Sequence, residues 1–325
     1  MKKETFEKIV REYDLGSLVE EPSRVYGGYL HKSYKLVTTK NTYFLKYFGT
    51  TNNVNETIER YRIQSELEDL LKKNKVPAIY SIEFNNRKVQ IVDNEVFYLF
   101  PWCDGVAIKG KDATKRHCKK IAKISSLIHS FDTKYKGKLK EVHIDWKSYM
   151  DIAKEKNDYI YNMLNENIDM LNELIDKGNK YYSLIPSVST ICHNDMDCKN
   201  VLWVNNECYL IDMECLGYGN PYLETFKHAL VWSGYEEACI NFKLYNYFYK
   251  KYFKYSRFKN EVDMEALYYG SFLDLEWLEV NIKRALKLVG ESEEIYLMGM
   301  DQSKETIERI RHFYQNRDKI INVKY

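Results

Sequence analysis

The sequence predicts an α+β protein of two lobes: an N-terminal lobe with a five-stranded antiparallel sheet and one inserted helix, and a mostly helical C-terminal lobe. Alternation of apolar and polar residues, which is typical of strands, is concentrated in the first hundred residues. Apolar residues at helical spacing dominate the remainder. At 325 residues the chain is long for one compact domain. We therefore divide it into residues 1–101 and residues 102–325.

The N-terminal lobe is expected to begin with a helix and three strands. Residues 24–48 alternate apolar and polar side chains, with interruptions at Gly27-Gly28 and at a Lys40-Asn41 turn. A helix is predicted over about 56–73, with an apolar stripe formed by Ile58, Tyr61, Ile63, Leu67, Leu70 and Leu71. Two more strands are expected near 79–84 and 88–100, which completes a sheet of five.

The C-terminal lobe is predicted to contain helices around a small group of strands. A helix over 112–131 would begin at Asp112 as its N-cap, and a long helix would cover roughly 145–178. Short strands are expected at 189–193, 201–204 and 208–212, the last two joined by Asn205-Asn206, a hairpin signal. About four helices would fill 222–318, with breaks at Gly234, Tyr255-Ser256 and Gly290.

Composition argues against several classes of partner. Lys and Arg total 49 and Asp and Glu total 47, so the formal charge is only +2 and no basic stripe indicates nucleic acid. No run of 18 apolar residues predicts a membrane span, and the N-terminal "MKKETFEKIVREYDL" lacks the apolar centre of a secretory signal. Seven cysteines without CxxC spacing indicate reduced thiols in a cytoplasmic protein. No feature indicates the oligomeric state.

Two polar segments in the C-terminal half have the spacing of a phosphoryl-transfer site. They are "ICHNDMDCKN" (191–200) and "YLIDMECLGYGNP" (209–221). Asn200 and Asp212 offer the amide and carboxylate oxygens that Mg²⁺ prefers. Asp195 would then accept a hydrogen bond from an attacking hydroxyl. This division of roles is the one expected where catalysis consists of positioning and charge neutralisation.

The N-terminal lobe supplies residues suited to a nucleotide. Gly27 and Gly28 would let the backbone approach phosphates closely. Lys46, on the third strand among apolar neighbours, would bind phosphate, and Glu66 on the following helix would pair with it, with Glu59 as the alternative. The segment "FYLFPW", which contains Phe100 and Trp102, would form a connector whose backbone meets the base.

These segments resemble those of the aminoglycoside phosphotransferase and choline kinase-like superfamily, small-molecule relatives of the protein kinases. "HNDMDCKN" (193–200) resembles its His-x-Asp-x4-Asn catalytic loop, "LIDMECLGYGNP" (210–221) its metal loop, and "FPWCDG" (100–105) its connector. The resemblance extends from the N-terminal hairpin to about residue 235 and implies a protein kinase-like bilobal fold.

The resemblance also implies roles for single residues. Asp195 becomes the catalytic aspartate, Asn200 and Asp212 the Mg²⁺ ligands, and Lys46 the lysine on the α- and β-phosphates. His193 would be structural.

The chain departs from the family pattern at several positions near the predicted chemistry. Position 194 is Asn where many members have Gly, and Asp197 stands where many have His. Asn220 and Glu224 replace aspartates that are common after the metal loop. Asp197 adds a second carboxylate near the chemistry, and Glu214 is either a supporting acid or substrate contact, or a turn residue.

The function expected is an Mg²⁺-dependent kinase that uses ATP or GTP to phosphorylate a hydroxyl of a small molecule. Asp274 and Glu276, with Glu279, could bind the ammonium groups of an aminoglycoside, although a charged outer helix face is the favoured explanation for them. Trp277, with nearby tyrosines, could instead bind a quaternary ammonium such as choline through cation–π contact, and a choline- or ethanolamine-type kinase is the alternative. A small sugar is a third possible acceptor.

Three other readings of the sequence compete with this one. A zinc site from Cys192, His193, Cys198, Cys208 and Cys215 matches no common ligand spacing. A kinase-fold protein without turnover, such as a spore-coat-like binding protein, would be expected to have lost a catalytic residue, whereas Lys46, Asp195, Asn200 and Asp212 are all present. A protein kinase is disfavoured because Asp-Phe-Gly and Ala-Pro-Glu motifs are missing.

Overall fold

The structure is a computed structural model that describes residues 1–26, 31–131, 140–259, 261–290 and 292–323. The chain forms two compact units. Unit 1 consists of residues 1–107 and 193–217, and unit 2 of residues 108–192 and 218–325. The segment 193–217, with most of both predicted chemical loops, therefore belongs to the same unit as the N-terminal sheet. The lobe boundary after residue 101 stays a prediction.

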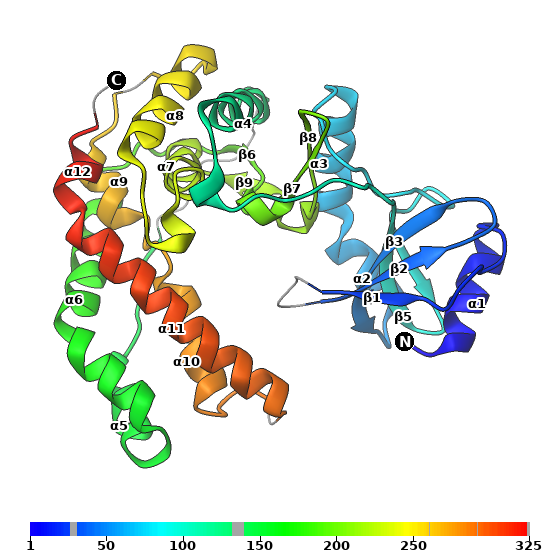
Figure 1. Cartoon of the computed structure of the whole chain (residues 1–325), viewed down its shortest axis with the longest axis horizontal. Coiled ribbons are helices and arrows are strands. Elements are labelled where there is room, and N and C mark those ends of the chain that lie inside the picture. The colour runs from blue at the N-terminus through cyan, green and yellow to red at the C-terminus, as the bar shows by residue number, and fades with distance from the viewer. Residues whose placement is uncertain (27–30, 132–139, 260, 291, 324–325) are drawn as a thin grey trace. The chain divides into compact units, whose positions relative to one another are not determined.

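Unit 1 is built on a five-stranded antiparallel sheet with the strand order β1-β2-β3-β5-β4, of which Figure 1 labels β1, β2, β3 and β5. Its strands and helices are α1 (Lys3–Glu12), β1 (Ser23–Val25), β2 (Lys32–Val37), β3 (Thr42–Thr50), α2 (Val54–Arg60), α3 (Arg62–Lys73), β4 (Val89–Val92) and β5 (Glu95–Pro101). A second antiparallel pair, β7 (Val201–Val204) and β8 (Glu207–Leu210), carries the predicted chemistry. The predicted five-stranded sheet is confirmed.

Two of the predicted strands were placed wrongly within that sheet. Residues 79–84 form only an isolated bridge, between Phe84 and Arg87. The run 88–100 is not one strand but the hairpin β4–β5, which turns at Asp93 and Asn94 with φ of 49° and 63°. Asp and Asn tolerate this left-handed backbone better than other residues with a Cβ, so the turn fits there.

The inserted helix is also divided. It breaks at Tyr61, where the backbone leaves the helical region (φ −94°, ψ 2°), so α2 and α3 take its place. Ile63, predicted on the apolar stripe, is 46% exposed, whereas Leu67 and Leu71 are buried. The stripe therefore covers the core over α3 only from Leu67 onward.

The sheet has a core on each face, because successive side chains of a strand point to opposite sides. On one face, Leu45 of β3 and Phe97 and Leu99 of β5 pack with Phe6 and Ile9 of α1. On the other face, Tyr98 of β5 packs with Phe48, Ile58, Tyr61 and Phe100. Lys46 lies between Leu45 and Tyr47 and pairs with Tyr98 across the ladder. It therefore points to the face that α2 and α3 cover.

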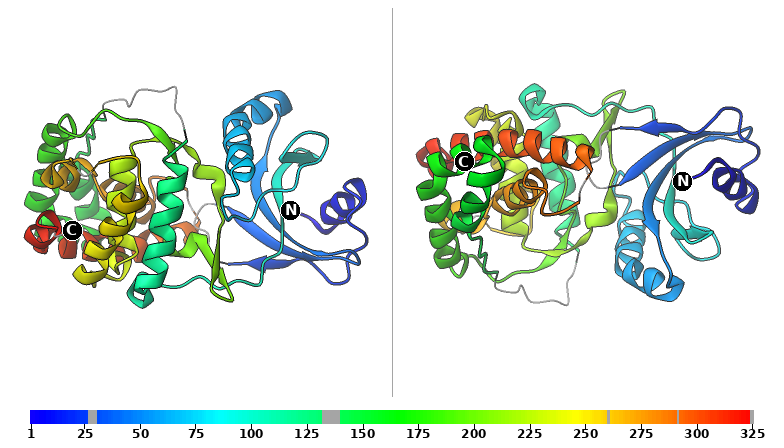
Figure 2. Two further views of the ribbon diagram at one scale, coloured as in Figure 1. Left: turned by 90° about the horizontal axis from the view of Figure 1, so that it is seen from above. Right: turned by 90° about the horizontal axis from the view of Figure 1, so that it is seen from below.

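Unit 2 is mainly helical, and Figure 2 shows its helices from two further sides. Its elements are η1 (Gly110–Asp112), α4 (Lys115–Ile128), α5 (Trp146–Lys156), α6 (Asp158–Tyr182), β6 (Thr190–Cys192), α7 (Pro221–Val231), η4 (Tyr235–Glu237), α8 (Phe242–Tyr255), α9 (Met264–Gly270), α10 (Leu275–Ala285), α11 (Glu293–Gln315) and α12 (Arg317–Ile321). Strand β9 (Gly217–Gly219), which pairs with β6, begins at the last residue of unit 1.

The boundaries of these helices follow local capping. α4 begins after Thr114, whose backbone N–H donates to His117 Nδ1 (3.2 Å), and not at Asp112, which lies in η1. The long predicted helix 145–178 is interrupted at Asn157, whose side chain caps α6. The breaks predicted at Gly234, Ser256 and Gly290 are present, and the two glycines have φ of 103° and 73°, which favour glycine.

Aromatic residues fill the interior of unit 2. The tyrosines at 245, 249, 252, 268 and 269 are all buried, and Tyr268 stacks on Phe313 with ring centroids 4.2 Å apart. This explains much of the high tyrosine content as packing. None of the helices in the described part of the chain combines the length and apolar character needed to cross a lipid bilayer.

Candidate active site

Hydrogen bonds between its own polar groups hold the predicted catalytic loop, residues 193–200. Asn200, which is buried, donates through Nδ2 to the backbone oxygen of Asp195 (2.8 Å) and to Asp195 Oδ2 (2.7 Å). The backbone N–H of Asn200 donates to Asp197 O (2.9 Å), and Asn200 O accepts from Ile211 N–H (3.0 Å). The carboxylate of Asp195 is therefore fixed in direction by Asn200.

The backbone at position 194 explains one departure from the family pattern. Asn194 has φ of 63°, a left-handed conformation that glycine adopts freely and asparagine tolerates best among residues with a Cβ. Its side-chain Nδ2 also donates to Cys215 O (2.8 Å), which glycine could not do. Asn194 thus replaces the usual glycine without loss of backbone geometry and joins the two chemical loops.

The β7–β8 hairpin carries Asp212 to the site. Asn205 and Asn206 form its turn with φ of 47° and 82°, as predicted. Leu210 is anchored to the segment 77–79 through both backbone groups, since its N–H donates to Pro77 O (3.0 Å) and its oxygen accepts from Ile79 N–H (2.8 Å). Asp212 follows in a left-handed conformation (φ 62°, ψ 55°), which turns its side chain out of the strand direction.

Lys46 pairs with two carboxylates of the metal loop. Its Nζ lies 2.5 Å from Asp212 Oδ1 and 2.7 Å from Glu214 Oε2. The side chains are only 12%, 27% and 19% exposed, respectively. Burial acts to lower the pKa of Lys46, but the charges of Asp212 and Glu214 outweigh it and raise the pKa above its usual value. We call these three residues the Lys46 cluster.

The pairing predicted for Lys46 on the helix is wrong in the structure. Glu66 is 62% exposed and pairs with Arg62 (2.6 Å), and Glu59 pairs with the same arginine (2.9 Å). The helix instead contributes Gln64, whose Nε2 donates to the backbone oxygen of Glu214. The side chains of Glu59 and Glu66 therefore point to solvent, and Glu214 supplies the second carboxylate.

The Lys46 cluster contains a carboxylate that is expensive to ionise. The pKa of Glu214 is raised by burial and by the neighbouring charges of Asp212 and Asp195, and Lys46 offsets this only in part. One ammonium group thus pairs with two carboxylates, and the charge of a third, Asp195, also acts on Glu214. The missing positive charge, together with the carboxylate and amide oxygens of Asp212 and Asn200, fits a divalent cation such as Mg²⁺.

His31 adds an aromatic and basic group to the same place. Its Nε2 lies 3.8 Å from Glu214 Oε1, and its ring centroid lies 4.4 Å from that of Phe48. Its pKa is lowered by burial and by the charge of Lys46. Sequence reasoning missed both His31 and Gln64, because neither belongs to a motif and only the folded sheet and helix bring them to Glu214.

The other predicted nucleotide residues have mixed outcomes. Gly27 and Gly28 lie outside the described residues. Phe100 belongs to β5 and pairs with Phe44 of β3, and the backbone N–H of Trp102 continues this ladder by donating to Thr42 O (3.1 Å). Both side chains are half-buried, and Lys35 Nζ lies 4.7 Å from the Trp102 ring centroid. Their role toward a base stays a prediction.

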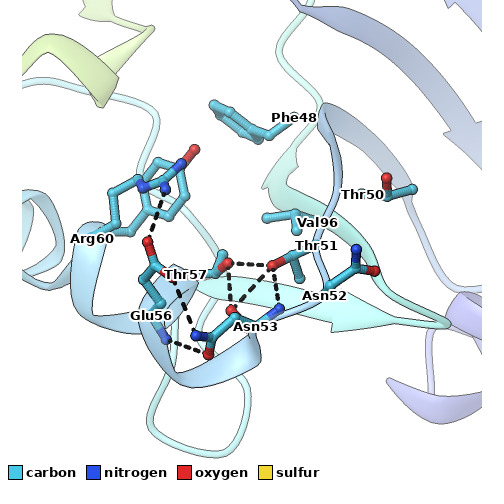
Figure 3. Close-up of a pocket in the computed structure, with 10 residues that line it drawn as sticks. Phe48, Thr50, Thr51, Asn52, Asn53, Glu56, Thr57, Arg60 and Val96 are labelled. Atoms are coloured by element: carbon cyan, nitrogen blue, oxygen red, sulfur yellow. Dashed lines mark hydrogen bonds and ion pairs between the residues drawn. The ribbon is translucent and has the colours of Figure 1, made fainter.

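A separate pocket of unit 1 lies at the start of α2 and is shown in Figure 3. Polar side chains from 50–60 line it, where Asn53 caps the helix and Thr51 bonds Thr57 (2.8 Å). Among the residues predicted for the site, none lines this pocket in the part of the chain that the structure describes. Phe48 lines it and also lies 5.9 Å from Lys46 Nζ, measured to the ring centroid.

The acids predicted to bind a substrate are engaged with basic residues of unit 2. Asp274 accepts from Arg309 Nε and from Tyr235 OH, both at 2.9 Å, so it is an internal ion-pair partner. Glu276 pairs with Lys140, and its side chain is 56% exposed. Trp277 faces Arg284, whose guanidinium carbon lies 5.3 Å from the ring centroid. The ion pair with Arg309 thus gives Asp274 a structural role.

The remaining predicted residues are buried in or near the loops. Asp197 is only 6% exposed, so a direct substrate contact at its carboxylate is not favoured. Cys192, Cys198 and Cys208 are buried, whereas Cys215 is exposed. Of the cysteines and His193 considered together as a zinc set, only Cys192 joins a group of three potential metal ligands among the described residues, and its neighbours there are His129 and Glu224.

Comparison with known proteins agrees with these features. Residues 22–245, more than half of the chain, match the model of the phosphotransferase enzyme family. No significant relative was found among curated proteins.

Solved structures share the fold at low sequence identity. A spectinomycin phosphotransferase bound to ADP and spectinomycin is 16% identical, with 97% of this chain and 99% of that chain covered and a TM-score of 0.71. An ethanolamine kinase of Plasmodium vivax is 16% identical (88% and 81% covered, TM-score 0.57). A choline kinase of Cryptosporidium parvum Iowa II is 15% identical (99% and 97% covered, TM-score 0.55). The predicted kinase-like fold is confirmed.

Proposed function

Because the chain belongs to the phosphotransferase enzyme family, and is thus a small-molecule phosphotransferase, we propose that it transfers the γ-phosphoryl group of ATP or GTP to a hydroxyl of a small molecule, with Mg²⁺ as the bound cation. The observation that carries this proposal is the assembly of four residues in unit 1. Lys46 contacts Asp212 at 2.5 Å, and Asn200 contacts Asp195 at 2.7 Å. The resemblance in the sequence assigns a role in phosphoryl transfer to each of the four.

The chain's own residues divide the reaction between them. Asp195, held in direction by Asn200, accepts a hydrogen bond from the acceptor hydroxyl and takes its proton as the hydroxyl oxygen bonds to the γ-phosphorus. The bond from phosphorus to the β-phosphate oxygen breaks, and its electron pair leaves with the nucleoside diphosphate. Lys46 is placed by its two carboxylates to donate to nucleotide phosphates.

A cation would complete the charge balance of this site. Asn200 Oδ1 and the Asp212 carboxylate would hold Mg²⁺, which neutralises phosphate oxygens when bound. Since Nδ2 of Asn200 donates to Asp195, its Oδ1 is the atom that remains for a metal ion. Glu214 would keep Lys46 in place through its ion pair of 2.7 Å.

For the acceptor, we place an aminoglycoside-type molecule first. Glu276 is an exposed carboxylate whose ion pair with Lys140 a substrate ammonium group could replace. The Trp277 ring already faces a guanidinium group, which competes with the quaternary ammonium of choline. Choline, ethanolamine and small sugars remain the acceptors to compare.

The test is ADP release by the full chain with Mg²⁺-ATP or Mg²⁺-GTP, against a panel of aminoglycosides, spectinomycin, choline, ethanolamine and small sugars. We expect turnover with at least one acceptor, and we expect Asp195→Asn to reduce kcat at least about 10³-fold with little change in nucleotide binding. Equal activity of that variant would end the proposed mechanism. No turnover together with no thermal stabilisation by either nucleotide would indicate a binding protein instead.

A further inference from the structure

A second group of potential metal ligands lies inside unit 2, apart from the residues proposed for phosphoryl transfer. His129, Cys192 and Glu224 offer one nitrogen, one sulfur and one oxygen, and these atoms all lie within 4.8 Å of one another. His228 lies beside them, with its Nε2 3.8 Å from Glu224 Oε1. The four side chains form what we call the His129 cluster.

The cluster is assembled from three separate elements. His129 is the residue that ends α4, and Cys192 is the last residue of β6. Glu224 and His228 are four residues apart on α7, which places them on one face of that helix. Because three elements meet here, no local sequence spacing reveals the group.

The site is closed to solvent. His129 and Cys192 have no exposed surface, and His228 and Glu224 are 1% and 7% exposed. A carboxylate, a thiol and two imidazoles are costly to bury together unless their polar atoms are satisfied by one another or by an ion.

In each of the two imidazole rings, the Nδ1 atom contacts a hydroxyl group. His129 Nδ1 contacts Tyr252 OH at 2.7 Å, and His228 Nδ1 contacts Ser125 Oγ at 3.0 Å. The other nitrogen of each ring faces Glu224, since His129 Nε2 contacts Oε2 and His228 Nε2 is the nitrogen close to Oε1. Metal-binding histidines commonly have this arrangement, in which an outer contact on one nitrogen fixes the other toward the ion.

We propose that the His129 cluster binds one structural Zn²⁺ through His129 Nε2, Cys192 Sγ and a carboxylate oxygen of Glu224, with His228 Nε2, 3.8 Å from Glu224 Oε1, as the nearest candidate for a fourth ligand. Nitrogen, sulfur and oxygen ligands in a closed site suit zinc, whereas Mg²⁺ prefers oxygen ligands. A thiolate and a carboxylate together balance the charge of Zn²⁺. On binding, the Cys192 thiol loses its proton to solvent as the sulfur–zinc bond forms. This site does not depend on the proposed phosphoryl transfer.

The alternative is a metal-free hydrogen-bonded network with the same residues. The two differ in stoichiometry: a zinc site holds one equivalent of metal after exhaustive dialysis, and a network holds none. The untagged full-length chain is therefore purified from zinc-supplemented cells without chelator, and its metal content is measured by mass spectrometry. About one Zn²⁺ per folded chain is expected.

Cobalt substitution tests which residues bind. The chain is stripped of metal and loaded with Co²⁺, and a thiolate-to-cobalt charge-transfer band in the near ultraviolet is expected in the wild type and absent in Cys192→Ser. Cys118→Ser is the matched control, because Cys118 is equally buried in unit 2 and its Sγ donates to the backbone oxygen of Trp232 (3.3 Å). The control should keep both the band and the metal.

Two outcomes would overturn the proposal. A folded wild-type chain that holds less than about a tenth of an equivalent of zinc, and shows no cobalt band, has a hydrogen-bonded network at this place. Equal metal content in Cys192→Ser and Cys118→Ser would place the ion elsewhere. If Cys192→Ser fails to fold, the zinc content and the cobalt spectrum of the wild-type chain decide between a zinc site and a hydrogen-bonded network.

Discussion

The Lys46 cluster of unit 1 and the His129 cluster of unit 2 gather charge in different ways. In the first, a lysine and carboxylates with 12% to 27% exposure remain within reach of a ligand. In the second, imidazole, thiol and carboxylate groups are closed off by the fold. A partly open cluster with an excess of carboxylate suits a reaction that exchanges its ligands, whereas a closed cluster suits a group that stays.

The largest effect that separates the two clusters is expected at Lys46. Lys46→Met should lower kcat by about 10²–10³-fold, because a fixed positive charge at the phosphates is lost. Lys88→Met is the matched control: Lys88 is also buried in unit 1 and pairs with Asp69 (2.6 Å) and Glu68 (3.8 Å), but not with the loops. Rates are measured by ADP release at saturating substrates, and stability by chemical denaturation.

The control should lose stability and keep its rate. If both lysine variants lose activity equally, the effect of Lys46 is one of folding and not of position. The partly open cluster would then be structural, like the closed one.

A smaller effect is expected at Asp274, which sequence reasoning associated with substrate. Asp274→Asn should lower the free energy of unfolding by about 2–3 kcal/mol, since Arg309 is left as a charge with 11% exposure. The KM for the acceptor should stay unchanged. Denaturation midpoints and acceptor titrations are compared with those of Glu276→Gln, whose exposed carboxylate should cost little stability. A raised KM without a change in stability would restore Asp274 as a substrate contact.

The smallest effect is expected at Asn194. Asn194→Ala should cost about 1–2 kcal/mol, because alanine is strained at a φ of 63° and cannot donate to Cys215 O. Asn194→Gly removes only the hydrogen bond and should cost about 1 kcal/mol or less. Denaturation of both variants separates the two contributions. Equal stability of alanine and glycine at this position would contradict the assigned backbone strain.

The β7–β8 turn and the spacing of the loop residues could be predicted because residues close together in the sequence determine them. The Asn205-Asn206 turn, the left-handed pair at the β7–β8 hairpin, followed directly from residue type. Asp93-Asn94 carries a similar signal, but the apolar residues on both sides suggested one continuous strand. The spacing of Asp195, Asn200 and Asp212 was informative because all three belong to consecutive loops around one hairpin.

The rest depends on contacts that spacing cannot supply. Helical periodicity could not show whether Glu59, Glu66 or neither faces Lys46, because the predicted helix breaks at Tyr61 into α2 and α3. The second carboxylate that pairs with Lys46 belongs to Glu214, which lies 168 positions further along the chain. The His129 cluster is similar, since its ligands come from α4, β6 and α7.

The irregularity in β3 has a consequence for how this fold can vary in evolution. Tyr47 pairs with Phe97 and Gly49 with Val96, so Phe48 is an extra residue in the ladder. A bulge absorbs a change of register, and every side chain before it keeps its face of the sheet. Insertions or deletions in the β4–β5 hairpin, beyond the bulge, therefore need not turn Lys46 away from its partners. The outer edge of the sheet is free to change length between relatives while the lysine stays in place.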